Sequence, residues 1–212
     1  MIKLTEKQQQ IVDSNARIKL IMGGVRSGKT LVSLMCLFDK MKKKNNENTQ
    51  AVIYVISPAF QLYTGREIKA LIDKEILISI SNRIDIIEFK TIYGTITITV
   101  FDIEEFEEYR PHIDIILIDN ATRNKYLAKI YEEYKVRFVD IIVSGHCPED
   151  ETNTFYKIWN KAYANNDDDI KAFKLKTWDN PTMTDKKEEW ERDLLKHMTL
   201  ERYIRDYYAT II

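Results

Sequence analysis

The sequence predicts an α/β protein with a mostly parallel central sheet and helices on both faces. Short apolar runs rich in β-branched residues alternate along the chain with segments of helical periodicity, the pattern of strands joined by crossover helices. The chain has 212 residues, of which 44% are hydrophobic and 31% are charged. These values suit one globular domain over residues 1–212 and exclude a fibrous or largely disordered chain.

The charge balance and the cysteine count exclude several classes of protein. The sequence has 32 basic and 33 acidic residues, so the net charge is −1. Any contact with nucleic acid therefore depends on a local basic patch. Two cysteines, Cys36 and Cys147, cannot form a disulfide framework. No apolar run reaches the roughly 18 residues that span a bilayer, and the N-terminus lacks a secretory core. We therefore expect a cytoplasmic protein without a membrane partner.

The N-terminal half is expected to supply a helix, two strands and a β-hairpin insertion. Thr5-Glu6-Lys7-Gln8 has the pattern of a capping box and begins the first helix. Apolar runs predict strands at residues 18–22 and 51–56. Residues 84–101 alternate in polarity and predict a hairpin that turns near Gly94. Apolar spacing predicts helices over residues 31–41 and 65–77.

The C-terminal half continues the alternation of strands and helices. Strands are expected at residues 113–119, 138–143 and 170–177, and helices at residues 124–134, 154–164, 185–197 and 200–208. The last two helices belong to a helical C-terminal segment, about residues 178–212. The polar stretches 42–48 and 165–169 predict solvated loops rather than linkers between domains.

Three of the six glycines cluster within residues 23–28, where backbone must bend or approach a ligand closely. The surrounding stretch matches G-x-x-x-x-G-K-[ST] and reads Gly23-Gly24-Val25-Arg26-Ser27-Gly28-Lys29-Thr30. Backbone N–H groups of such a loop and the N-terminus of the following helix bind phosphates. Lys29 is expected to reach the β- and γ-phosphates, and the Thr30 hydroxyl to bind Mg²⁺. The motif predicts a P-loop NTPase that binds a nucleoside triphosphate with magnesium.

A P-loop also needs a strand that ends in a carboxylate, and Asp119 after residues 113–118 meets this need. We expect Asp119 to hold Mg²⁺ through water. The next residue is Asn120, where most ATPases of this class have Glu. Asn orients a water by hydrogen bonding but cannot accept its proton. Hydrolysis is therefore slow, uses another carboxylate, for example from the acidic run 102–108, or is lost.

The strand at residues 138–143 runs into Ser144-Gly145-His146-Cys147-Pro148. Polar residues at the carboxyl end of a parallel strand lie where open α/β sheets bind ligands. We expect Ser144 to sense the γ-phosphate. His146 and Cys147 have no Cys or His partners at metal-binding spacing, so the sequence predicts no metal site there.

Together these motifs resemble the ATPase domain of viral, phage-type terminase large subunits, the motors that package double-stranded DNA into procapsids. The resemblance covers nearly the whole chain and rests on an ordered set of segments, at residues 4–8, 23–30, 115–119, 144–148, 155–159, 177–181 and 201–208. It implies a Mg²⁺-dependent ATPase in the host cytoplasm. The implied partners are the double-stranded viral DNA, identical subunits in a ring on the procapsid portal, and a small terminase subunit.

The resemblance also implies roles for single residues. Gln8 is expected to contact adenine, although its place in the capping box accounts for it equally well. Arg26 is expected to act on the γ-phosphate in cis, and Arg110 as an arginine finger in trans, the alternative for each being a surface arginine. DNA contacts are expected from basic side chains that are otherwise solvated, namely Lys40, Lys42, Lys43 and Lys44, or Arg123, Lys125 and Lys129.

Two departures from the family keep other functions open. Asn120 replaces the family's Glu, which favours a nucleotide-binding switch with little hydrolysis. No nuclease domain is expected within these 212 residues. A P-loop kinase for a small molecule is the second alternative. Such a kinase needs an arginine-rich lid, and Arg66 and Arg83 stand isolated in the sequence.

Overall fold

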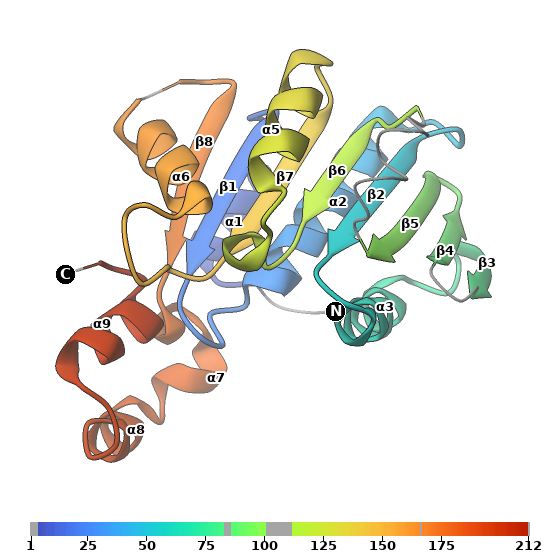
Figure 1. Ribbon diagram of the computed structural model, residues 1–212. Coiled ribbons are helices and arrows are strands. Elements are labelled where there is room, and N and C mark those ends of the chain that lie inside the picture. Colours follow the sequence, from blue (N-terminus) through green and yellow to red (C-terminus); the bar gives the residue numbers. More distant parts are fainter. Residues whose placement is uncertain (1–3, 83–85, 101–111, 166, 212) are drawn as a thin grey trace.

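The computed structural model describes residues 4–82, 86–100, 112–165 and 167–211. Its described strands form one sheet in the order β3-β4-β5-β2-β6-β7-β1-β8 (Figure 1). Pairing is parallel from β5 to β8, whereas β4 runs antiparallel to both β5 and β3. The mostly parallel sheet is confirmed. The bounds are β1 (Ile18–Gly23), β2 (Gln50–Val55), β3 (Leu77–Asn82), β4 (Ile86–Thr91), β5 (Gly94–Val100), β6 (Ile115–Ile118), β7 (Asp140–Gly145) and β8 (Ile170–Leu175).

Helices cover both faces of the sheet, as predicted. They are α1 (Glu6–Asp13), α2 (Lys29–Lys44), α3 (Pro58–Leu71), α5 (Leu127–Val136), α6 (Thr154–Ala164), α7 (Pro181–Thr184), α8 (Lys187–Leu194) and α9 (Leu200–Tyr208). Short 3₁₀ turns lie at η1 (Ala121–Arg123) and η2 (Thr177–Asp179). The helices α7 to α9 stand apart, beyond the carboxyl ends of the strands (Figure 1).

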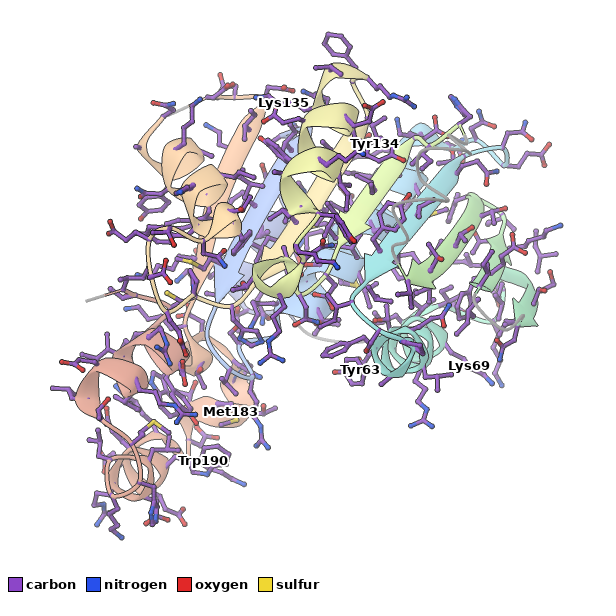
Figure 2. The ribbon with its side chains drawn as sticks, viewed as in Figure 1. Tyr63, Lys69, Tyr134, Lys135, Met183 and Trp190 are labelled. Carbon is purple, nitrogen blue, oxygen red and sulfur yellow. The ribbon has the colours of Figure 1, made fainter. Side chains whose placement is uncertain are left out.

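The central strands are buried on both faces, which explains their continuous apolar runs. Leu20 of β1 packs into a core with Tyr134 of α5 (labelled in Figure 2), whereas its neighbour Ile21 packs into the opposite core with Leu37 of α2. Because consecutive strand residues point to opposite faces, one strand joins both cores. The carboxyl ends of β1, β6 and β7 are thereby held side by side.

A buried lysine anchors the first helix to the sheet. Lys19 lies in β1, and its Nζ donates to the backbone oxygens of Ile11 (2.9 Å) and Val12 (2.8 Å), at the end of α1. These carbonyls have no partner within the helix, so the ammonium satisfies them. Burial lowers the pKa of Lys19.

The hairpin is confirmed, with β4 and β5 joined at Gly94, but the segment before it was predicted wrongly. Helix α3 spans Pro58–Leu71 rather than residues 65–77, and Leu77 already belongs to β3. Proline suits the first turn of a helix because its missing N–H has no partner there anyway. The strand β3 was not predicted, since it is an exposed edge strand without a buried face.

Smaller differences occur at the ends of other elements. Lys42, Lys43 and Lys44 form the last turn of α2 rather than a loop, and Asn45 ends that helix in a left-handed conformation. Phe138 was predicted within a strand but has φ 57° and is 82% exposed. The short helix α7 was not predicted, and α8 and α5 are shifted or shortened relative to the ranges expected for them.

No helix in the part of the chain that the structure describes is long and apolar enough to cross a membrane.

Candidate nucleotide-binding site

The loop of residues 23–30, here called the phosphate loop, connects the end of β1 to the start of α2 as the motif predicts. Gly28 begins the helix at φ 84°, a left-handed conformation that favours glycine. A Cβ atom on Gly24 would lie 2.6 Å from the backbone oxygen of Tyr207. Gly28 therefore allows the turn into the helix, whereas Gly24 allows the C-terminal helix α9 to approach the loop closely.

Lys29 is folded back over the phosphate loop. Its Nζ donates to the backbone oxygen of Gly24 at 2.7 Å and lies 3.4 Å from Nδ1 of His146. Burial lowers the pKa of Lys29 to about 8, although the charge of Asp119 acts in the opposite direction. The buried Oγ of Ser27 has no hydrogen-bond partner among the described residues. An unpartnered buried hydroxyl beside a buried ammonium fits a phosphate ligand.

Asp119 follows β6 and is 3% exposed. Its carboxylate accepts from Ser144 Oγ at 2.5 Å and from Thr30 Oγ1 at 3.3 Å. The predicted magnesium ligands Thr30 and Asp119 and the predicted sensor Ser144 thus meet at one point. Burial raises the pKa of Asp119, while the hydrogen bond from Ser144 acts to lower it.

The donor set fits Mg²⁺ rather than a metal held by protein ligands alone. No group of three or more His, Cys, Asp or Glu side chains that could hold a metal occurs within the described ranges. Mg²⁺ in nucleotide sites is bound by one or two protein oxygens together with phosphates and water. Thr30 and Asp119 supply that number.

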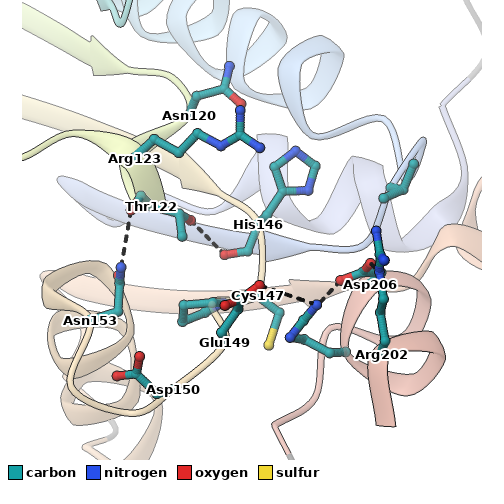
Figure 3. Close-up of a pocket in the computed structure, with 13 residues that line it drawn as sticks. Asn120, Thr122, Arg123, His146, Cys147, Glu149, Asp150, Asn153, Arg202 and Asp206 are labelled. Atoms are coloured by element: carbon teal, nitrogen blue, oxygen red, sulfur yellow. Dashed lines mark hydrogen bonds and ion pairs between the residues drawn. The ribbon is translucent and has the colours of Figure 1, made fainter. Parts of the chain in front are cut away.

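Asn120 follows Asp119 in a left-handed conformation, at φ 56°. Its Nδ2 donates to Asp119 Oδ2 at 3.4 Å. Asn120 lines a cavity of about 580 Å³ together with Thr122, Arg123 and His146 (Figure 3). The amide is therefore turned toward the Asp119 carboxylate, the predicted metal ligand, at the edge of this cavity.

Three arginines line the same cavity, although the sequence predicts no arginine-rich lid. Arg123 comes from η1, and Arg202 and Arg205 come from α9. Arg202 and Arg205 pair with Asp206 at 3.3 and 3.0 Å, and Arg205 lies 3.7 Å from Glu149. Arg123 has no ion pair within the described residues. The fold brings α9 close to η1, although the two elements lie far apart in the sequence, and no local motif predicts this proximity.

The C-terminal segment holds the backbone of the phosphate loop. Val25 N–H donates to the Asp206 oxygen at 2.6 Å, and the Val25 oxygen accepts from Thr177 Oγ1. The Arg26 oxygen accepts from Asn180 Nδ2 at 2.7 Å. Nothing in the spacing of Thr177, Asn180 and Asp206 predicted these contacts, so sequence reasoning missed this part of the site.

Gln8 lies beside the phosphate loop and Arg26 belongs to it, and both make contacts that their predicted roles do not specify. Gln8 is buried, forms the predicted capping box with Thr5, and donates from Nε2 to the Ser27 oxygen at 3.3 Å. The guanidinium of Arg26 lies 5.0 Å from the ring centre of Trp190 on α8, a residue labelled in Figure 2. Arg26 is not among the residues that line the cavity.

One predicted DNA contact is wrong, and one predicted catalytic residue cannot be placed. Lys40 is buried, pairs with Asp140 at 2.6 Å and donates to the Ala16 oxygen at 3.0 Å, so it serves the fold. Lys44 pairs with the same aspartate at 3.1 Å. Arg110 and the acidic run 102–108 lie outside the described residues.

The parallel sheet, the phosphate loop and the carboxylate at the end of the neighbouring strand define a P-loop NTPase fold. Solved structures with the same fold are phage large terminase ATPase domains. The ATPase domain from Thermus phage P74-26 matches with TM-score 0.70 and 13% identity, covering 99% of this chain and 94% of that one. No family model and no curated protein sequence matches the chain.

Two longer terminases share the fold. The large terminase of a thermophilic bacteriophage in complex with ADP matches with TM-score 0.73 and 14% identity, over 99% of this chain and 54% of that one. The HK97 bacteriophage large terminase matches with TM-score 0.70 and 10% identity, over 98% and 50%. The chain therefore spans about half the length of these two proteins.

Proposed function

We propose that the chain is the ATP-binding and ATP-hydrolysing motor domain of a terminase that packages double-stranded viral DNA. The observation that carries the proposal is the cluster of Asp119, Ser144 and Thr30, in which Asp119 and Ser144 are buried and the charge of Asp119 acts on Lys29. The fold of phage terminase ATPase domains, one of them in complex with ADP, supports it.

The residues of the chain have separate tasks in this proposal. Loop N–H groups and Lys29 bind the β- and γ-phosphates. Lys29 then donates to the phosphate oxygens in place of the Gly24 backbone oxygen. Thr30 and Asp119 would hold Mg²⁺, which when bound neutralises charge that develops on the transferred phosphoryl group. Ser144 donates to Asp119 and would report the phosphate state to the C-terminal segment.

The further parts of the proposal follow the resemblance. Identical subunits form a ring on the procapsid portal and complete the site, with Arg110 as arginine finger in trans and Arg26 acting on the γ-phosphate in cis. Gln8 contacts adenine. Double-stranded DNA passes through the ring, a small terminase subunit assists, and the assembly works in the host cytoplasm.

Two observations favour alternatives. Asn120 donates to Asp119 and cannot accept a proton, which favours a nucleotide-binding switch with little hydrolysis. Arg123, Arg202 and Arg205 line one cavity, which favours a kinase whose acceptor binds there. The kinase would yield a phosphorylated small molecule in place of free phosphate.

Phosphate release from Mg-ATP at micromolar protein tests the proposal, with and without double-stranded DNA, and with Lys29→Ala as the blank. The proposal predicts release that depends on Lys29 and a specific rate that rises with protein concentration as subunits assemble. Nucleotide binding without release by the parent chain or by Asn120→Glu would contradict the motor and favour the switch.

A further inference from the structure

The cavity beside the phosphate loop contains a half-buried side chain that the proposed chemistry does not use, the imidazole of His146. Thr122 Oγ1 donates to the His146 backbone oxygen at 2.7 Å and holds this turn after β7. The Nδ1 atom lies 3.4 Å from Lys29 Nζ. Figure 3 shows the ring on the side of the cavity where Asn120 and Arg123 lie. His146 therefore stands beside the lysine that would bind the γ-phosphate.

The contacts of His146 define its protonation state. An ammonium only donates, so the Nδ1 atom that faces Lys29 carries a lone pair and the proton sits on Nε2. The charged groups that face the ring are Lys29 from α2, Arg123 from η1 and Asp206 from α9. Burial, followed by the two cations, lowers the pKa of His146 to about 4. The imidazole is therefore neutral at neutral pH and can accept a hydrogen bond.

The carboxylates that line the cavity within the described residues make their contacts with groups other than Lys29. Asp206 accepts from two arginines, and Glu149 lies 3.7 Å from Arg205 with its side chain 85% exposed. Asp150 accepts from the backbone N–H of Thr152 at 2.7 Å. The Asn120 amide donates to Asp119. His146 is the acceptor of this cavity that contacts Lys29 directly.

We propose that His146 is a catalytic residue of this site and holds the attacking water at Nδ1 once Lys29 has moved onto the phosphates. The inference rests on the proposed ATPase. The water oxygen forms a bond to the γ-phosphorus while the bond from that phosphorus to the bridging oxygen breaks. ADP leaves with the electron pair of the broken bond. The water proton passes to Nδ1 and then to the released phosphate, and the negative charge of the bound triphosphate favours this transfer. His146 thus supplies the acceptor that Asn120 lacks.

The test compares steady-state phosphate release by His146→Ala, His146→Gln and the double variant His146→Ala, Asn120→Glu. We expect His146→Ala to lower kcat about 100-fold while KM for Mg-ATP stays within about threefold, since the lost group acts on the water. His146→Gln keeps an acceptor oxygen and should retain more activity. The double variant should recover, because its carboxylate takes over the role. The exposed His197, changed to Ala, is the matched control.

Each outcome decides for or against the inference. Unchanged kcat in His146→Ala, in an active parent, would overturn it and leave the ATPase intact. An equal loss with and without Asn120→Glu would assign His146 a merely structural role and would also overturn it. No Lys29-dependent release by the parent or by Asn120→Glu would overturn the ATPase itself, and the inference with it. If thermal unfolding shows that His146→Ala is not folded, His146→Gln takes its place in the test. The kcat of the parent is then compared with that of His146→Gln, each with and without Asn120→Glu.

Discussion

The phosphate loop lies between two regions that hold it by different means. The strand side, formed by Asp119 after β6 and Ser144 of β7, presents buried polar side chains to the loop. The C-terminal side comprises residues 177–207. It binds mainly the backbone of the loop, at Val25 and Arg26. In the proposed function the first region supplies the chemistry, whereas the contacts of the second hold the shape of the loop. Substitutions on the strand side should therefore reduce turnover and leave the free energy of unfolding nearly unchanged. Substitutions on the C-terminal side should lower the free energy of unfolding and affect turnover less.

The largest effect is expected on the strand side, from Asp119→Asn. An amide cannot replace the charge of the proposed magnesium ligand, so phosphate release should fall about 1000-fold. The free energy of unfolding should stay within about 1 kcal/mol of the parent or rise, because the buried carboxylate costs desolvation. Steady-state kinetics and urea unfolding measure both. A loss of several kcal/mol in stability would show that the cluster is structural.

Gly24→Ala tests the contact between the loop and α9. The added Cβ atom would lie 2.6 Å from the Tyr207 oxygen, so the loop or the helix must shift. We expect a loss of about 1–3 kcal/mol in the free energy of unfolding. Nucleotide binding, measured by calorimetry, should weaken about tenfold.

The control for that variant is Gly65→Ala in α3, where the added atom would lie 3.3 Å from a terminal carbon of Ile87. Alanine is favoured over glycine by about 1 kcal/mol within a helix, which offsets the tight contact. If both variants lost the same stability, close approach of α9 would not explain the requirement for glycine at position 24.

Affinity for Mg-ATP should fall as pH rises through about 8, because the free site then loses the charge on Lys29. Between pH 7 and 9 we expect the Kd to rise about tenfold, whereas Lys29→Arg should show no such change. The folded chain binds fewer protons at Lys29 than the unfolded chain between pH 8 and 10.5. Stability should therefore rise with pH over this window, and less so in Lys29→Met. A Kd that is independent of pH would contradict a lowered pKa at this lysine.

Asn180→Ala should have the smallest effect, on the C-terminal side. It removes the hydrogen bond to the Arg26 oxygen and the cap that Asn180 provides for Thr182 N–H. The free energy of unfolding should fall by about 1–2 kcal/mol, and turnover by about threefold. Asn165→Ala, at the exposed end of α6, is the control, and we expect it to cost less than about 0.5 kcal/mol. A turnover loss as large as that of Asp119→Asn would erase the distinction between the two regions.

The difference between the two regions also explains what the sequence could predict. The strand side follows from local patterns, because Lys29, Asp119 and Ser144 each end or begin a predictable element at one edge of a parallel sheet. The structure brings these three together as expected, with Ser144 donating to Asp119 and Lys29 interacting with the Asp119 charge. Their roles in binding and hydrolysis remain predictions.

The C-terminal side depends on contacts between residues far apart in the chain, and no periodicity encodes them. The bond from Asn180 to Arg26 spans 154 positions, and both partners are ordinary surface residue types. Edge strand β3 was missed for a related reason, since an exposed strand lacks the buried alternation that identifies the other strands. Patterns of burial predict elements, whereas polar contacts between distant loops require the fold.

A single-turnover experiment tests directly whether the chain hydrolyses ATP at the site of Lys29. The chain, in excess over ATP labelled on the γ-phosphate and with Mg²⁺ present, is compared with its Lys29→Ala variant, and every labelled product is separated. We expect labelled free phosphate from the parent and none from the variant. Retention of intact ATP by the parent, or transfer of the label to another molecule, would contradict it.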